Sequence, residues 1–479
     1  MKQYQMWIDG KWVEAESGRR YPVFNPATEA EIAQLPLGGK ADVDKAVAAA
    51  KKAFPAWSKK SVAERAEIMG KIGAAIRENA GELGRLESID HGFPLKIATE
   101  FATMTARTFE WASQAASSFL TGDTLPTDCN TLSYTKREPV GVCAVITPWN
   151  FPLMMITDKL PAILAAGNTC VIKPPSIDSL SALKLAEILE KLDIPQGVVN
   201  VITGPGGTVG EALASHRDVN MVAFTGSCEV GKRIMELASQ TVKRLQLELG
   251  GKNPVIILDD ADLDMAVAAG VRGQTFNCAQ VCASPGRFYV HENLYDAFVE
   301  KFVDGMKKVV VGDPADEKTQ MGPVVSAEHR ARIEGFIKSG IDEGARLVLG
   351  GKRPTKPPLD KGYFVLPTVF THVKQNMIIA REEIFGPVAC IMEPFSSDNE
   401  VIAKSNDNTF GLKATVYSQD RAKVLRFTNE LQAGTVLANN ARGAELPWGG
   451  FKESGLGKER FKWGLYEFSQ LKVVSINID

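Results

Sequence analysis

Two cysteines four residues apart are the first candidates for chemistry. Cys278 and Cys282 lie in the segment 277–287, and both thiols share one face if that segment is helical. A metal pair is one interpretation, but the nearest histidine, His291, lies beyond a strand-like run, which disfavours zinc. A thiolate nucleophile is the other, and it needs a lowered pKa. Most free cysteines are buried small hydrophobic residues, which is the interpretation for Cys129, Cys143, Cys170 and Cys390.

A nucleophilic thiol also needs a general base. Glu248 lies between two leucines, where we expect a helix to end at Gly250-Gly251. A carboxyl group in such surroundings is a candidate for a raised pKa, the usual route to a carboxylate base. An exposed glutamate at a helix end is the alternative, and this motif alone would favour it. A Cys–His pair has little support, because all five histidines lie in polar, surface-like contexts: His91, His216, His291, His329 and His372.

Two turns between an expected strand and an expected helix could hold a phosphate. They span residues 203–210 and 224–231, and both contain glycine. Glycine lets backbone amides and a helix N-terminus approach a pyrophosphate. The first turn is not a clean GxGxxG, so two tight turns without a ligand are an equal alternative.

Composition bounds the class of protein. The chain has 479 residues, enough for two to four domains, with 44% hydrophobic and 23% charged residues. A formal charge of −2 indicates neither a nucleic-acid nor a membrane partner. Seven cysteines without a CxxC argue against a disulfide framework. No apolar stretch reaches ~18 residues and no signal peptide is visible, so we expect a cytoplasmic protein.

The order of elements indicates an α/β fold. A hairpin is expected around Asp9-Gly10, then helices from about 41 to 117. After residue 140, apolar strand-like runs alternate with helical segments at 180–192 and 230–247, as in a parallel sheet covered on both faces. Sites on such sheets lie outside the carboxyl ends of the strands. The runs are Val142–Ile146, Cys170–Ile172, Val198–Ile202, Met221–Phe224 and Val255–Leu258.

A second series of runs indicates another α/β unit. Two further segments, 131–137 and 471–478, alternate apolar and polar residues, and we expect them to pair with each other or with another subunit. The runs of the second series are Arg287–Val290, Val309–Val311, Leu347–Leu349, Val388–Met392 and Thr415–Tyr417.

Seven motifs in a fixed order resemble the aldehyde dehydrogenase superfamily over nearly the whole chain. The separation of 34 residues between Glu248 and Cys282 is also similar to that of the family. The motifs are Pro148-Trp149-Asn150-Phe151-Pro152, Ile172-Lys173-Pro174-Pro175, Phe224-Thr225-Gly226-Ser227, Leu247-Glu248-Leu249-Gly250-Gly251-Lys252, Gln280-Val281-Cys282 with Arg287, Glu383-Ile384-Phe385-Gly386-Pro387, and Pro447-Trp448-Gly449-Gly450-Phe451-Lys452.

The resemblance implies three catalytic residues. Cys282 matches the nucleophile, Glu248 the general base, and Asn150 the amide that stabilises the oxyanion together with the backbone N–H of Cys282. The thiolate adds to the aldehyde, hydride leaves to the nicotinamide, and water releases the carboxylate from the resulting thioester. No metal is implied.

The resemblance also implies NAD or NADP as cofactor. Many members that prefer NAD carry Glu three positions after the lysine that matches Lys173, where this chain has Ser176. Serine removes a repulsion of the 2′-phosphate, so we expect NADP to be tolerated, while NAD stays open. The implied cofactor-binding residues are Ile146, Pro148, Trp149, Lys173, Ser176, Gly206, Phe224, Gly226, Ser227, Glu383 and Phe385.

Two residues depart from the family where the substrate enters. Asp158 stands where members with apolar substrates often carry Trp, and Arg442 where an aromatic residue often lies. If both line the pocket, Arg442 could meet a carboxylate; a pair between the two is the alternative. Aromatic aldehydes and acidic semialdehydes both remain open. Ala279 replaces the usual Gly, with only a local backbone effect expected. Further pocket candidates are Phe151, Met155, Val281, Ala283 and Trp448.

The implied architecture has three parts. These are a doubly wound, Rossmann-like cofactor domain (1–120 and 140–250), an α/β catalytic domain (251–450) and a small β oligomerisation unit (121–139 and 451–479) in a homodimer or homotetramer. A coenzyme A-acylating enzyme is an alternative function, but such members commonly lack a residue that matches Glu248. An inactive structural relative is another, against which the three catalytic residues argue.

Overall fold

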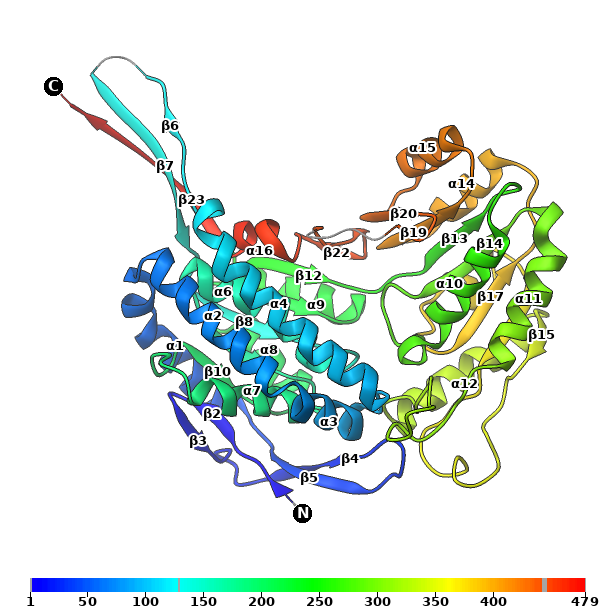
Figure 1. Cartoon of the computed structure of the whole chain (residues 1–479). Helices are drawn as coiled ribbons and strands as arrows, with labels where there is room; N and C mark the ends of the chain where they lie inside the picture. Colours follow the sequence, from blue (N-terminus) through cyan, green and yellow to red (C-terminus); the bar gives the residue numbers. More distant parts are fainter. Residues whose placement is uncertain (1, 128–129, 442–445, 479) are drawn as a thin grey trace.

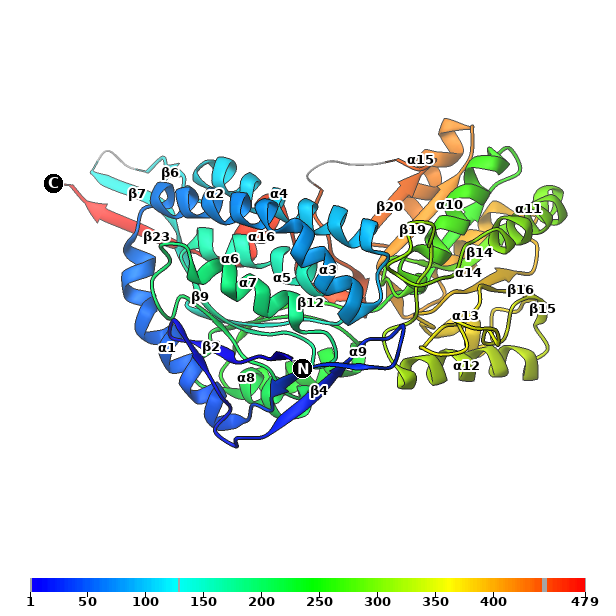
Figure 2. The same ribbon diagram turned by 60° about the horizontal axis from the view of Figure 1, so that its bottom comes forward.

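The computed structural model describes residues 2–127, 130–441 and 446–478. Figure 1 shows two lobes, each built on a largely parallel sheet, and a ribbon of strands that projects from the first lobe. Figure 2 shows the same two lobes side by side in a second view. The α/β class expected from the sequence is confirmed.

The first lobe contains an eight-stranded sheet in the order β22-β12-β11-β8-β9-β10-β2-β3. Its five central strands are parallel, and the chain runs from β8 out through β9 and β10, then returns to the other side of β8 for β11 and β12. The strand order therefore reverses between β8 and β11, where ligands of doubly wound sheets bind. The strands are β2 (Met6–Ile8), β3 (Lys11–Val13), β8 (Val142–Ile146), β9 (Thr169–Lys173), β10 (Val199–Val201), β11 (Met221–Thr225), β12 (Arg244–Glu248) and β22 (Gly455–Leu456).

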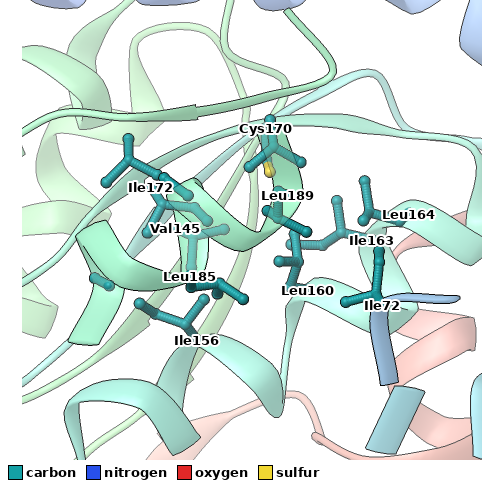
Figure 3. Packing of buried hydrophobic residues seen from close by; sticks show 14 of the residues in the cluster. Ile72, Val145, Ile156, Leu160, Ile163, Leu164, Cys170, Ile172, Leu185 and Leu189 are labelled. Carbon is teal, nitrogen blue, oxygen red and sulfur yellow. The ribbon is translucent and has the colours of Figure 1, made fainter. Parts of the chain in front are cut away.

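Helices cover both faces of this sheet. Near-continuous apolar strands allow this, because side chains on both faces are buried. Figure 3 shows one face, where Val145 and Ile172 of the sheet pack against Leu160 and Leu185 of the covering helices. That face is covered by α2 (Val62–Glu78), α3 (Ala80–His91), α4 (Leu95–Phe119), α5 (Pro152–Thr157), α6 (Leu160–Ala166) and α7 (Leu180–Glu190), and the other by α1 (Lys40–Lys59), η1 (Gly206–Gly210), α8 (Glu211–Ser215) and α9 (Cys228–Ser239).

The second lobe contains a seven-stranded sheet in the order β15-β16-β17-β14-β13-β19-β20, with only β15 antiparallel. Its strands are β13 (Asn253–Ile257), β14 (Pro285–Val290), β15 (Arg346–Leu349), β16 (Thr368–Val373), β17 (Val388–Met392), β19 (Lys413–Tyr417) and β20 (Thr435–Ala438). Its helices are α10 (Leu263–Thr275), η2 (Phe276–Ala279), η3 (Glu292–Leu294), α11 (Tyr295–Lys307), α12 (Ala327–Asp342), α13 (Ile378–Arg381), α14 (Asp398–Asn406) and α15 (Arg421–Glu430).

Three small sheets complete the fold. In the projecting ribbon, β7 (Thr131–Pro139) pairs along its length with β23 (Ser469–Asn477), which confirms that the two alternating segments pair with each other. β6 (Thr124–Leu125) extends the ribbon, and α16 (Phe461–Glu467) precedes β23. The other small sheets are formed by β1 (Lys2–Gln3), β4 (Arg20–Phe24) and β5 (Glu31–Pro36), and by β18 (Phe410–Gly411) and β21 (Phe451–Lys452).

Several local expectations are wrong. The segment 230–247 is not one helix: α9 ends at Ser239, Val242 adopts a left-handed φ of 49°, and β12 follows. Pairing with β11 and β22 supplies hydrogen-bond partners for the backbone of β12, and this outweighs the helical spacing of its apolar residues. Residues 309–311 form only an isolated bridge from Val311 to Met321. Strands β16 and β20 were not expected.

No helix in the described part of the chain is both long and apolar enough to cross a membrane.

Candidate active site

The three implied catalytic residues come from different elements that meet between the two lobes. Asn150 follows the carboxyl end of β8, and Glu248 is the last residue of β12. Cys282 lies between η2 and β14 of the second lobe. Glu248 therefore ends a strand, not a helix as expected from the sequence.

The segment before Cys282 has an unusual backbone. Asn277, Cys278 and Ala279 adopt left-handed φ values of 50°, 53° and 53°. Cys278 and Cys282 consequently do not share a helix face. Cys278 is buried, and its thiol donates to the carbonyl of Gly322 at 3.1 Å, whereas Cys282 is partly exposed. Of the two cysteines, only Cys282 can meet a substrate.

Asn150 is held against the loop that carries Cys282. Its side-chain Nδ2 donates to the carbonyl oxygen of Gln280 at 3.1 Å. In return, Nδ2 of Asn277 donates to the carbonyl oxygen of Asn150 at 2.8 Å. The Asn150 amide has a second hydrogen, which leaves one donor for an oxyanion.

A buried chain of polar groups supports Asn277. His91 Nε2 lies 2.8 Å from Asn277 Oδ1, and His91 Nδ1 lies 3.2 Å from Asp178 Oδ2. Burial lowers the pKa of His91 to about 4 and raises that of Asp178 well above its usual range. We therefore assign a protonated Asp178 that donates to Nδ1, and an Nε2–H that donates to Asn277.

The expectation that all histidines are surface-like is wrong for two of them. His91 is fully buried, and His329 is buried with its Nε2 donating to the carbonyl of Phe385 at 2.8 Å. Each has a polar partner inside the fold, which offsets the cost of burying the ring nitrogens.

The surroundings of the Cys282 thiol disfavour its ionised form. Burial raises its pKa to about 12, with further contributions from the carboxylates of Glu383 and Glu248. Its carbonyl accepts a hydrogen bond from Asn253 Nδ2 at 2.7 Å. The loop is therefore fixed, and the thiol needs a base or a nearby cation to ionise.

Glu248 has the environment of a carboxylate base. Its side chain is buried, and neither carboxylate oxygen has a hydrogen-bond partner among the described residues. Burial raises its pKa well above its usual range, and Glu459 raises it further. The alternative of an exposed glutamate is wrong, because this side chain is buried. Gly449 lies against this carboxylate, since a Cβ there would be 2.8 Å from Oε1.

A buried ion pair next to Glu248 was missed from the sequence. Lys159 and Glu459 form an ion pair, and Lys159 Nζ also donates to the hydroxyl of Thr225 at 2.7 Å. Thr225 is the register partner of Glu248 in the sheet. The only signal was the run of charged residues 458–460 after a glycine-rich motif.

The implied cofactor residues gather at the switch point of the first sheet. Ile146 is the register partner of both Lys173 and Phe224, so three neighbouring strands end together. Lys173 is buried, and its ammonium has no hydrogen bond or ion pair to any described residue. Burial lowers its pKa to about 8. Ser176 donates through its hydroxyl to the carbonyl of Gly204 at 2.8 Å.

The two turns differ in how closely they are packed. A Cβ on Gly206 would meet nothing within 4 Å, so the backbone of that turn is open to a ligand. A Cβ on Gly226 would lie 2.4 Å from the ring of Phe224, so a side chain at this position would displace that ring. Ser227 caps α9 by accepting a hydrogen bond from the N–H of Val230.

The second lobe adds Glu383 and Phe385 to this region. Glu383 Oε1 accepts a hydrogen bond from the N–H of Gly251 at 3.0 Å, and burial raises its pKa to about 7. The ring of Phe385 meets that of Trp149 edge-on at 5.2 Å. Trp149 follows Pro148 after β8, so this contact joins the two lobes.

The expected pocket residues divide into two groups. Phe151 and Met155 belong to a cluster with Phe93, Phe101 and Phe276, whose rings lie 5.5–6.0 Å apart. These three phenylalanines were missed from the sequence, since they come from separate segments. Val281 and Ala283 flank Cys282 and line a cavity of about 370 Å³.

Asp158 pairs with a residue that was not anticipated. Its carboxylate accepts hydrogen bonds from Arg460 at 2.8 and 3.1 Å, and the Arg460 guanidinium lies over the ring of Trp448 at 5.6 Å. Arg442, the partner suggested from the sequence, lies outside the described residues.

Comparison with known proteins agrees with this geometry. The model of the aldehyde dehydrogenase family matches residues 12–474. The chain belongs to the aldehyde dehydrogenase family.

Several proteins that are similar to this chain in sequence or structure are aldehyde dehydrogenases. Betaine aldehyde dehydrogenase of Bacillus subtilis is 41% identical, with 98% of this chain and 97% of the relative covered. Human retinaldehyde dehydrogenase 3 is 42% identical, over 100% of this chain and 94% of the relative. The crystal structure of Staphylococcus aureus betaine aldehyde dehydrogenase with NAD+ has a TM-score of 0.97 at 37% identity, covering 99% of this chain and 95% of that one.

Proposed function

We propose that this aldehyde dehydrogenase oxidises an aldehyde to the carboxylic acid with NAD(P)+ and water, with Cys282 as the nucleophile. The observation that supports this best is the placement of a partly exposed thiol on a loop that is bonded to Asn150. The pKa of that thiol responds to the unpartnered carboxylate of Glu248.

The first step joins the thiol sulfur to the carbonyl carbon. The Cys282 proton leaves to a base, and negative charge develops on the former carbonyl oxygen. The free hydrogen of Asn150 Nδ2 and the backbone N–H of Cys282 are the proposed donors to that oxygen. One such donor contributes about 3–4 kcal/mol to the transition state.

The residues at the switch point fit a dinucleotide. A bound nicotinamide would supply the acceptor for the hydride of the adduct carbon, and Cys282 would then carry the acyl group as a thioester. Lys173 offers an unpaired buried ammonium to the adenosine ribose, the open turn at Gly206 admits the pyrophosphate, and Glu383 can accept hydrogen bonds from the other ribose. Ile146, Pro148, Trp149, Phe224, Gly226, Ser227 and Phe385 are the proposed surroundings of the same ligand.

Ser176 supports tolerance of NADP as well as NAD. Its side chain is neutral and already donates to Gly204, so it presents oxygen lone pairs but no negative charge to a 2′-substituent. A carboxylate at this position would repel a 2′-phosphate. The choice between the cofactors is therefore set by this position together with Lys173.

Glu248 is the proposed base for the second step. It removes a proton from water, whose oxygen then attacks the thioester carbon, and the Cys282 sulfur leaves. A carboxylate without partners in a buried position suits this role, because its raised pKa makes it a stronger base. Its presence favours water over coenzyme A as the acceptor.

Aromatic aldehydes and acidic semialdehydes are the proposed substrate classes. The phenylalanine cluster that includes Phe151 supports an aromatic ring, because offset and edge-on ring contacts are favourable. Asp158 and Arg460 neutralise each other, which leaves recognition of an anion to other cations near the pocket.

The domain division and a homodimer or homotetramer stay proposals. The ribbon supports them, because it projects from the first lobe and carries exposed apolar side chains on β23, such as Leu471 and Val473. Within the segment 451–479, however, β22 adds a strand to the first sheet. We also propose a cytoplasmic location.

One assay tests the proposed function. The purified protein is given a panel of aldehydes with NAD+ or NADP+, with and without coenzyme A, and formation of reduced cofactor is followed at 340 nm. We expect turnover that does not depend on coenzyme A and yields the free acid. A strict requirement for coenzyme A would show that the acyl group is transferred to coenzyme A and not to water. No turnover with any aldehyde would contradict the proposed oxidation of aldehydes.

A further inference from the structure

A cavity of about 370 Å³ lies directly beside the loop that carries Cys282. Val281 and Ala283, the two neighbours of Cys282, line it from one side. Most of the remaining wall comes from α10 and from strands β13, β19 and β20 of the second lobe, and Phe276, Ser284, Pro285, Asn440 and Ala441 complete it. A molecule in this cavity therefore lies against the loop that carries the proposed nucleophile.

Strand β19 contributes a cationic side chain, Lys413, to the wall of this cavity. Side chains alternate along a strand, so Lys413, Thr415 and Tyr417 share one face, and all three line the cavity. Ala414 and Val416 point the other way into the hydrophobic core. Lys413 is half-buried, so its ammonium is partly removed from bulk water.

A second cation, Arg272, lines the same cavity from α10. It also lines a larger groove of about 1010 Å³ on its other side, so it stands at the boundary between the two. Arg272 acts on the pKa values of both Lys413 and Tyr417, which places the three groups within electrostatic reach of one another.

Neither cation has an acidic partner in the described part of the chain. Among the described residues, no carboxylate oxygen lies within ion-pair distance of Lys413 or Arg272, and none of the residues that line the cavity is acidic. One neutral polar group of the wall, the Tyr417 hydroxyl, donates to Asn440 Oδ1 at 2.8 Å. Two neighbouring like charges without a counter-charge repel each other, and an anion between them would relieve that repulsion.

We propose that Lys413 and Arg272 form a carboxylate-binding subsite, so that the preferred substrates are aldehydes that carry a carboxylate. The inference rests on the proposed function and names its substrate class. A planar guanidinium and an ammonium suit a carboxylate, which accepts charge-assisted hydrogen bonds from both. The neutral wall residues then contact the carbon chain or ring between the two ends of the substrate.

The subsite and the nucleophile are fixed to each other by one side chain. The N–H of Lys413 donates to Asn253 Oδ1 at 3.0 Å, and Asn253 Nδ2 donates to the carbonyl of Cys282 at 2.7 Å. Cys282 also raises the pKa of Lys413, so the two side chains lie within electrostatic reach of each other. A substrate held by its carboxylate thus has its aldehyde end positioned relative to the sulfur.

Paired substrates test the proposal. Each pair differs only in charge: 4-oxobutanoate against 4-oxobutanamide, and 4-formylbenzoate against 4-formylbenzamide. The readout is the ratio of kcat/KM within a pair, because any general loss of activity affects both members and cancels. We expect the parent protein to favour the charged member by about tenfold or more in at least one pair.

Variants assign that preference to the two cations. Lys413→Met and Arg272→Met should each reduce the ratio about tenfold, and Lys413→Glu should reverse it. Lys11→Met, at an exposed edge of the first sheet, is the matched control and should leave the ratio unchanged. A parent protein that shows no preference, or variants that keep the parent ratio, would overturn the proposal.

A binding measurement separates this proposal from the proposed function. Benzene-1,4-dicarboxylate, the product expected from 4-formylbenzoate, is titrated calorimetrically into the parent and Lys413→Met proteins. Weaker binding to the variant supports the subsite even if no aldehyde is oxidised. Equal affinity for both proteins contradicts the subsite even if aldehydes are oxidised.

Discussion

The side-chain amide of Asn150 donates to the carbonyl oxygen of Gln280 at 3.1 Å, two residues before Cys282. This bond joins the carboxyl end of β8 in the first lobe to the loop of the second lobe. It holds the Asn150 amide against the loop that carries the Cys282 thiol. The proposed chemistry depends on that juxtaposition.

Replacement of Asn150 by alanine removes the proposed side-chain donor to the oxyanion. We expect kcat to fall about 100- to 1000-fold, because a lost donor of this kind costs about 2.7–4 kcal/mol. Steady-state kinetics with the best aldehyde of the panel measures this. Alkylation of Cys282 by iodoacetamide should persist, and a kcat within threefold of the parent value would exclude the oxyanion role.

Glu248→Gln should slow the release of the acid while hydride transfer survives. An acyl-enzyme is then expected to accumulate on Cys282, visible as the added acyl mass in intact-protein mass spectrometry. If the parent rate is retained and no adduct forms, Glu248 is not the base that activates water.

The pH profile follows from the same residue. Burial raises the pKa of Glu248 well above its usual range, and only the ionised form accepts a proton from water. The rate of acid release should therefore rise with pH as Glu248 ionises, and Glu248→Gln should remove that rise. An unchanged profile in the variant would assign the ionisation to another group.

Ala279 stores a small amount of backbone strain. Its φ of 53° is left-handed, which costs a residue with a Cβ about 1 kcal/mol relative to glycine. Ala279→Gly should raise the midpoint of urea unfolding. The matched control, Ala266→Gly inside α10, should lower it, and a lower midpoint for Ala279→Gly would contradict the strain.

Ser176→Glu should shift cofactor preference toward NAD. The added carboxylate repels a 2′-phosphate, and we expect the ratio of kcat/KM for NADP to that for NAD to fall about tenfold or more. Ser176→Gln has a similar length without the charge and serves as the control. If the NADP-to-NAD ratio of kcat/KM is the same in the glutamate and glutamine variants, the charge of the side chain does not cause the shift.

The sequence was sufficient for residues that act within short motifs and insufficient for those that depend on distant partners. Cys282, Glu248 and Asn150 could be named because each stands in a recognisable run. Lys159 and Glu459 could not, because 300 residues separate two side chains that meet only in the folded chain. The same holds for the phenylalanines around Phe151.

Backbone conformation limited the prediction in a second way. The left-handed run 277–279 contains no glycine, so nothing in the residue types indicated that Cys278 would turn away from Cys282. The sequence pattern predicts the end of a helix where strand β12 lies. The strand forms because it pairs with β11 and β22, which lie elsewhere in the sequence. The polar sequence around His91 predicts an exposed side chain. In the fold the ring is buried, because Asp178 and Asn277 provide partners for its two nitrogens.

The activity of Cys282→Ala tests most directly whether Cys282 is the nucleophile. Reduced cofactor is followed at 340 nm with the aldehyde panel, and NAD+ binding is measured by calorimetry on the same preparation. We expect the variant to bind NAD+ and to form no NADH with any aldehyde. Turnover near the parent rate would contradict the assignment of Cys282 as the nucleophile, and with it the proposed mechanism.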